Sequence, residues 1–157
     1  MAKRKSETAI ADEAPIITPL VVDAANKVAG RIASIVAKHL LQGEHVIVIN
    51  AVKAVLSGNR ASLIQEFKER LNIRTRSAPW KGPLHWREPH YILRRMIRGM
   101  LPWKKSRGRQ AMKRLRVYQG TPETVTITRR LDLPEFTRTG RRTTYLGEIA
   151  REIGWKG

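Results

Sequence analysis

Apolar residues recur along the first third of the chain with two different periods, and these periods predict strands and a helix. Residues 20–23 and 46–49 form short apolar runs. The second run is four β-branched residues without polar alternation, which is typical of a strand covered on both faces of a parallel sheet. Between them, apolar residues from Val28 to Leu40 share an arc of about 140°, which predicts a helix that Gly43 is placed to end. This order predicts a right-handed strand–helix–strand unit.

The middle of the chain alternates predicted helices with short strands. One helix runs from a cap at Asn59 to about Leu71. The next begins at Pro89 and ends near Leu101, and its two faces differ sharply. An apolar arc of about 180° holds Ile92, Leu93, Met96, Ile97, Met100 and Leu101. The opposite side of that helix presents Arg94, Arg95 and Arg98.

A third helix is predicted from a cap at Ser106 through about 113, and short strands are predicted at 54–56 and 115–118. The tail has helical spacing over 144–153, where Leu146 and Ile149 fall on one side. A helix this short needs a surface to dock on, either the protein's own core or a neighbouring protein.

Composition divides the chain into three parts. Residues 1–19 are predicted to be an N-terminal arm, 20–120 an α/β core domain with basic helices and loops, and 121–157 a C-terminal extension that ends in a short helix. Strands separated by helices favour a parallel sheet with helices above and below it. No internal repeat or low-complexity tract interrupts this organisation.

Charge is the most informative feature of the composition. The chain carries a net charge of +18, and 74–120 contributes fourteen Lys and Arg against a single acid, Glu88. Like charges repel on a compact surface, so such a field indicates a polyanionic partner, and a nucleic acid is the usual one. Arg outnumbers Lys by 20 to 11, and guanidinium groups bind phosphate oxygens with two parallel hydrogen bonds.

The sequence lacks cysteines, a membrane-spanning segment and a signal peptide. It has no Cys, which excludes disulfides and thiolate metal sites. No apolar run approaches the roughly 20 residues of a membrane span, and no signal-peptide core follows the first residues. We therefore expect a cytoplasmic protein.

Aromatic residues among the cations strengthen the nucleic-acid hypothesis. Trp80, Trp86 and Trp103 each have basic residues close by, and an exposed indole can stack on an unpaired base. The alternative is that these Trp side chains anchor the core or loops. His85 is interpreted as an RNA contact or as loop structure. His39 is interpreted as a core or near-surface histidine.

Residues with catalytic potential are sparse. The acids form no pair at a catalytic spacing, and Glu66 and Glu69 are interpreted as part of a solvated helix face. Phosphate-binding glycine motifs are absent. An enzyme on such a sheet needs polar groups converging at the strand ends, where only Asp23, Asn50 and Ser57 are available.

Two blocks of sequence resemble the universal large-subunit ribosomal protein family L-thirteen. The first runs from Val21-Val22-Asp23-Ala24 through Gly30-Arg31-Ile32-Ala33-Ser34 to Val48-Ile49-Asn50-Ala51 and Ser57-Gly58. The second comprises Ile97-Arg98-Gly99-Met100-Leu101-Pro102, Lys105-Ser106-Arg107-Gly108-Arg109 and Leu115-Arg116-Val117-Tyr118-Gln119-Gly120. The resemblance covers 20–121. The segments Ala78-Pro79-Trp80 and Leu146-Gly147-Glu148-Ile149 resemble the archaeal and eukaryotic branch, and the absence of a long C-terminal extension suggests the archaeal type.

The resemblance implies a three-layer α/β/α sandwich around a four-stranded parallel sheet, with extended N- and C-terminal segments. It implies a primary rRNA-binding protein of the large ribosomal subunit that supports early assembly beside neighbouring ribosomal proteins. It implies no catalysis and no cofactor. From the residues themselves we expect no metal site and no membrane partner, and we expect no small-molecule substrate. The family's rRNA-contacting regions correspond here to Arg94, Arg95, Arg98, Lys104, Lys105, Arg107, Arg109 and Arg114.

Charge and aromatic pattern extend this set of candidate RNA-binding residues in both directions. On the N-terminal side it adds Arg74, Arg76, Trp80, Lys81, His85, Trp86 and Arg87. On the C-terminal side it adds Trp103, Lys113, Arg138, Arg141 and Arg142. The segment 137–144 is interpreted as a strand or loop that tracks phosphates.

Two other functions compete with the structural role. The same surface could serve a translational regulator that binds mRNA off the ribosome, and the sequence does not separate these roles. A small enzyme on a doubly wound sheet is the third hypothesis, and the scarcity of polar groups at the strand ends weighs against it.

Overall fold

The computed structural model describes residues 18–123, 129–131, 133 and 142–157. Most of the predicted N-terminal arm, together with Arg138 and Arg141, therefore lies outside the described residues. The described elements are, in chain order, β1 (Leu20–Asp23), α1 (Ala29–Gln42), β2 (Val46–Ile49), the 3₁₀ turn η1 (Ala51–Lys53), β3 (Val55–Ser57), α2 (Arg60–Asn72), the 3₁₀ turn η2 (Pro79–Lys81), α3 (Pro89–Met100), α4 (Ser106–Lys113), β4 (Leu115–Val117), β5 (Arg129–Leu131), β6 (Thr143–Tyr145) and α5 (Leu146–Glu152).

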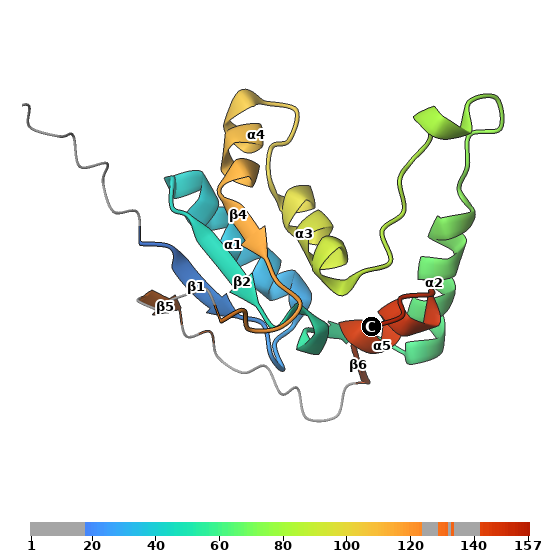
Figure 1. Ribbon diagram of the computed structural model, residues 1–157, viewed down its shortest axis with the longest axis horizontal. Coiled ribbons are helices and arrows are strands. Elements are labelled where there is room, and N and C mark those ends of the chain that lie inside the picture. The colour runs from blue at the N-terminus through green and yellow to red at the C-terminus, as the bar shows by residue number, and fades with distance from the viewer. Residues whose placement is uncertain (1–17, 124–128, 132, 134–141) are drawn as a thin grey trace, which may run out of the picture.

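A four-stranded parallel sheet in the order β4-β2-β1-β5 forms the centre of the molecule, with helices beside it (Figure 1). Leu20 pairs with Val46 on one side and Arg129 on the other. The predicted α/β class and four-stranded parallel sheet are confirmed. Strand β5 was not predicted, because Arg129-Arg130-Leu131 carries no apolar pattern. As an edge strand it pairs on one side only, so it does not need that pattern.

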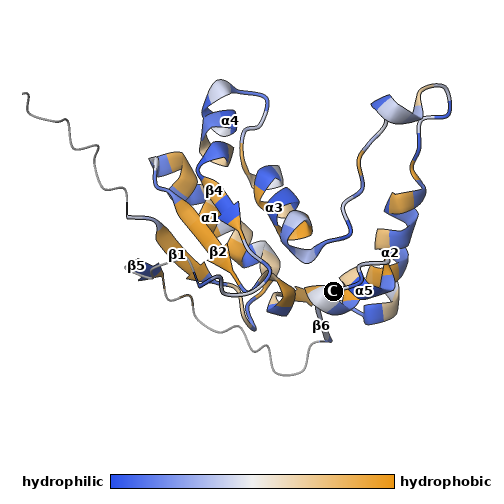
Figure 2. Ribbon diagram, viewed as in Figure 1, coloured by the Kyte–Doolittle hydropathy of each residue, from blue (hydrophilic) through white to orange (hydrophobic). Residues whose placement is uncertain are grey.

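The main core lies between the sheet and the packed helices α1, α3 and α4. Val22 and Val48 of the sheet are fully buried there, together with Ile32 of α1 and Leu93 and Ile97 of α3. Burying each such side chain stabilises the fold by about 1.5–3 kcal/mol relative to exposure. Figure 2 shows the resulting contrast between the hydrophobic strands and the hydrophilic surface of α4.

The helix ends follow the sequence signals only in part. Gly43 adopts φ 101°, as predicted for the end of α1, and the N–H of Glu44 bonds to the carbonyl of His39 at 3.2 Å. Asn59 precedes α2 as predicted, but its side chain makes no capping hydrogen bond. The predicted cap at Ser106 is wrong, since Lys105 occupies the N-cap position and Ser106 is the first residue of α4.

A second, two-stranded sheet lies beside the main one. The predicted strand at 54–56 exists as β3, but it pairs antiparallel with β6. Because Thr143–Tyr145 forms this strand, α5 begins at Leu146 and is shorter than predicted. It docks on the protein itself, against η1 and α2, with Leu146 and Ile149 fully buried.

The chain between α2 and α3, residues 73–88, makes a long excursion. Figure 1 shows it rising from α2 to the short turn η2 and then descending to α3. Most of its side chains are exposed. This excursion and the connection from α3 to α4 carry many of the predicted RNA-binding residues.

Candidate nucleic-acid interface

Helix α3 presents guanidinium groups on a side that its core packing fixes. Ile92, Leu93 and Ile97 are buried, so Arg95 and Arg98 lie on the exposed side, as predicted. Arg94 is only half-exposed. Met100, which was predicted to face the core, is 53% exposed. It is the last helical residue, and the core contact at this end of α3 is made by the next residue, Leu101, which is buried.

The turn between α3 and α4 and the helix that follows it carry five exposed cations. The N–H of Trp103 bonds to the carbonyl of Leu101 at 2.7 Å, and that of Lys105 bonds to the carbonyl of Pro102 at 2.9 Å. These hydrogen bonds form a tight turn that opens directly into α4. The exposed cations on the turn and the helix are Lys104, Lys105, Arg107, Arg109 and Lys113.

Two of the predicted RNA contacts also bind the C-terminal end of α1. Arg107 donates to the carbonyl of Leu41 at 3.2 Å, and Arg114 donates to that of Leu40 at 3.0 Å. A helix C-terminus has unsatisfied carbonyls and a partial negative charge, which guanidinium groups stabilise. Arg114 is also half-buried, so its position serves the fold, whereas Arg107 remains exposed.

All three tryptophans of the basic region lie at the surface. Trp80 is 80% exposed, Trp86 48% and Trp103 42%, which excludes the interpretation that they anchor the core. Trp86 packs on Tyr91 with ring centroids 4.5 Å apart. The guanidinium of Arg98 lies 5.2 Å from the centre of the Trp103 ring, within cation–π distance.

The excursion carries exposed Arg74, Arg76, Lys81 and Arg87. One hydrogen bond joins its two limbs, and another joins it to α3. The ring Nε2 of His85 pairs with the carbonyl of Ile73 at 2.9 Å, and Arg95 of α3 donates to the carbonyl of Leu84 at 2.9 Å. His85 therefore helps to hold the loop, as the loop-structure interpretation expects, and its contact with RNA stays a prediction.

At the N-terminal end of α3, His90 is partly buried beside Glu88 and Gln119. Burial lowers the pKa of His90 below its usual value; the Glu88 carboxylate opposes this and the Arg94 guanidinium adds to it. Gln119 bonds to the ring at 3.1 Å and ties α3 to the segment after β4.

Of the three arginines of the C-terminal extension that were predicted to bind RNA, the structure describes Arg142. This residue is exposed, and its carbonyl accepts the N–H of Gly58 at 2.9 Å. Arg138 and Arg141 lie outside the described residues. The exposed Arg116 and Arg129 were not among the predicted RNA-binding residues, although Arg116 lies between the apolar Leu115 and Val117 on a predicted strand.

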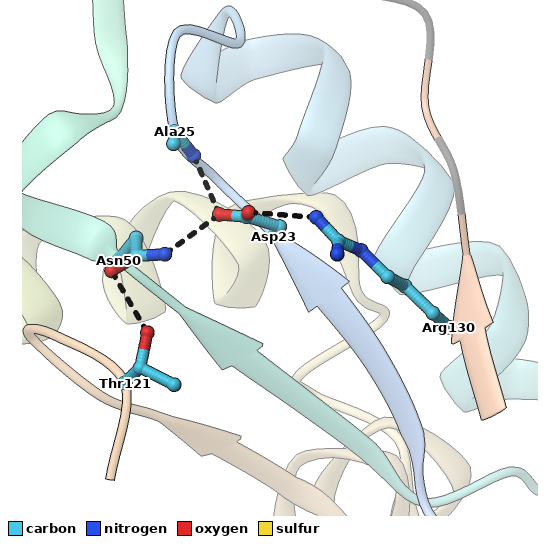
Figure 3. Close-up of polar contacts among 5 residues, drawn as sticks. All are labelled: Asp23, Ala25, Asn50, Thr121 and Arg130. Carbon is cyan, nitrogen blue, oxygen red and sulfur yellow. Dashed lines mark hydrogen bonds and ion pairs between the residues drawn. The ribbon is translucent and has the colours of Figure 1, made fainter. Parts of the chain in front are cut away.

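Polar groups do meet at the carboxyl ends of the strands (Figure 3). Asp23 accepts hydrogen bonds from the N–H of Ala25, the amide of Asn50 and the guanidinium of Arg130, each at 3.0 Å. Thr121 donates to the oxygen of Asn50 at 3.2 Å. Both carboxylate oxygens of Asp23 are therefore engaged within the protein, and the cluster ties β1, β2 and β5 together.

The charge state of this cluster follows from those contacts. Burial acts to raise the pKa of Asp23, but the hydrogen bonds from Ala25 and Asn50 and the positive charges of Arg130 and Lys27 outweigh it and hold the pKa below its usual value. Ser57, the third polar residue considered at the strand ends, pairs with Thr143 in the second sheet. The three do not form one site.

The other predicted acids and histidines also occupy structural positions. His39 pairs with Glu44 at 2.6 Å at the end of α1, and Glu66 pairs with Arg70 on the exposed side of α2. No group of side chains that could hold a metal ion occurs among the described residues. Over the same part of the chain, no helix has the length and apolarity to cross a bilayer.

Together the fold and surface define a small, basic α/β protein whose distinctive surface is cationic and aromatic. The family described as Ribosomal protein L13 matches residues 17–124 of this chain. The chain belongs to the ribosomal protein L13 family, whose members are structural components of the ribosome and not enzymes.

Curated relatives extend the match over most of the chain. A large ribosomal subunit protein uL13 from Methanopyrus kandleri is 43% identical over 141 residues, which cover 87% of each chain. The protein of that name from Archaeoglobus fulgidus is 41% identical and covered to 88% of its length, and that from Caenorhabditis elegans is 38% identical and covered to 70%. The resemblance to this family and to its archaeal type is confirmed.

Proposed function

We propose that this chain is a structural protein of the large subunit of the cytoplasmic ribosome, which binds rRNA through its basic surface and supports early subunit assembly. Family membership supports the ribosomal role. One observation carries the RNA-binding role: the exposed cations Lys104, Lys105 and Arg109 of the α3–α4 turn and α4 make no ion pair with an acid of the described chain. An rRNA backbone would neutralise them.

The proposed binding mechanism depends on a rigid support. Helices α3 and α4 are held on α1 by buried side chains, so the cations keep their mutual positions before RNA arrives. Phosphates bound at several points of this surface would fix the relative positions of the rRNA segments that carry them. Such bridging would support assembly with neighbouring ribosomal proteins, and it needs no cofactor or small-molecule substrate.

Charge removal on the turn tests the proposal. Each cation that neutralises a phosphate contributes about 0.7–0.9 to the slope of log K against log salt. The variant K104A/K105A/R109A should therefore bind large-subunit rRNA fragments with a slope shallower by roughly 2–3. The control K53A/K68A/R151A removes the same charge from η1, α2 and α5, which lie away from α4 (Figure 1).

The wild-type and control proteins should share one steep slope. A flat salt dependence for the wild type, or equal slopes for the two triple variants, would refute the proposed surface. Circular dichroism would verify that both variants are folded. Co-sedimentation with large subunits rather than with free mRNA complexes would favour the ribosomal role over translational regulation.

A further inference from the structure

A cleft lies between the descending limb of the excursion and the exposed side of α3. It has a volume of about 460 Å³, within the roughly 300–1,000 Å³ typical of sites that hold a small organic group. Leu84 and Trp86 line it from the excursion, Arg95 and Arg98 from α3, and Trp103 from the turn before α4. The cleft is therefore formed by segments that are separate in the sequence.

The aromatic rings of the cleft are already ordered. Trp86 is tilted by 31° against Tyr91, and this pair is joined to α3 because Tyr91 lies in its first turn. Trp103 has the guanidinium of Arg98 above its ring. Trp86 and Trp103 remain about half-exposed, so ring surface is available to a ligand at low entropic cost.

The charge of the cleft selects the kind of ligand. Arg94, Arg95 and Arg98 line it, and none of its described lining residues is an acid. Arg95 is held by the carbonyl of Leu84 and Arg98 by the ring of Trp103, so both guanidiniums are preorganised. Aromatic surface beside unbalanced positive charge matches a ligand with a flat ring and phosphates.

We propose that this cleft binds an unpaired nucleotide that protrudes from the rRNA, with its base stacked on Trp86 and its flanking phosphates on Arg95 and Arg98. The inference rests on the proposed rRNA-binding function and names the kind of RNA element that one part of the surface receives. A double helix covers both faces of every base, so paired RNA could use the cations of the cleft but not its rings.

A second hollow of about 400 Å³, which shares Trp86, Tyr91 and Arg95 with the first, is a poorer fit for a nucleotide. It is lined by two guanidiniums, of which that of Arg70 pairs with Glu66 and that of Arg95 also lines the first cleft. The nucleotide is therefore assigned to the first cleft, where three guanidiniums meet the rings.

The test compares two exposed aromatic residues. Replacing Trp86 by Leu removes the stacking surface, and its matched control Y145L removes a similarly exposed ring on β6 that does not line the cleft. Loss of one stacked base should weaken binding to deproteinised large-subunit rRNA roughly tenfold. W86L should leave the salt slope unchanged because it removes no charge, whereas Y145L should bind within about twofold of wild type. The variant W86F keeps a ring and should recover most of the affinity.

Ultraviolet crosslinking of the same complex gives an independent result. A stacked base should crosslink to the peptide that contains Trp86 and Tyr91, and W86L should lose this crosslink. Equal affinities for W86L and wild type, with the salt slope intact, would overturn the nucleotide cleft while leaving the rRNA-binding function in place. Absence of rRNA binding by the wild type would overturn both.

Discussion

Gly108 offers a sharp test of how the α3–α4 turn is built. A Cβ added at this residue would overlap the carbonyl of Pro102 and lie 3.0 Å from the backbone nitrogen of Trp103. The carbonyl of Pro102 cannot swing away freely, because it accepts the N–H of Lys105 at 2.9 Å. Gly108 therefore lets the turn that carries Trp103, Lys104 and Lys105 pack directly on the first part of α4.

The expected effect of Gly108→Ala is a balance of two opposing terms. Alanine gains about 1 kcal/mol over glycine in a helix interior. Overpacking costs about 1–3 kcal/mol, and the upper figure applies because the overlapped atoms belong to the backbone. The net expectation is a loss of about 2 kcal/mol, which lowers Tm by roughly 4–8 °C for a chain of this size.

Gly99→Ala is the matched control. Gly99 lies in the last turn of α3, and an added Cβ meets nothing within 4 Å. Its replacement should stabilise the protein by about 0.5 kcal/mol. Thermal and urea unfolding followed by circular dichroism measure both variants. If Gly108→Ala proved as stable as Gly99→Ala, the close packing of the turn on α4 would be refuted.

The remaining predictions concern the groups that tie distant segments together. Because the pKa of Asp23 lies below its usual value in the folded protein, its stabilising contribution is present above the unfolded-state pKa of about 4 and is lost as the pH falls through the lower folded-state pKa. Urea unfolding at several pH values should show this acid-side loss in the wild type and a smaller one in D23N, which weakens the pair with Arg130; identical pH profiles would contradict the assignment. R114A removes the donor to the carbonyl of Leu40 and should lower the free energy of unfolding by about 1 kcal/mol, whereas the exposed control R109A should change it by less than about 0.5 kcal/mol. Equal effects would mean that Arg114 does not cap α1.

The pattern of apolar residues was sufficient to predict the helices and strands that pack directly on the main core. The apolar side of α3, except Met100, and the strands at 20–23 and 46–49 follow from the residue pattern alone, and the structure confirms them. Burial repeats with the helical period along α3 and is almost continuous along the two central strands, so local sequence carries the information in both cases. The strand β5 escaped prediction because its position at the sheet edge imposes no such period.

The candidate interface was predictable by region rather than by residue. Charge density marked 74–120, and most of its cations are exposed. Sequence could not show that Arg107 and Arg114 bind the end of α1 or that Arg95 holds Leu84, because those partners lie 66, 74 and 11 positions away. The sequence likewise did not show whether the tryptophans are exposed or buried, because that depends on the fold.

The amino-acid sequence by itself determined the α/β class, the main helices and strands, and a basic region that contains several tryptophans. These features depend on composition and on short-range periodicity. Tertiary structure alone decided which guanidiniums cap helices and which remain available, and it brought the excursion against α3 to form an aromatic cleft. These outcomes depend on contacts between residues far apart in the chain, whose geometry is fixed only when the shared core is packed.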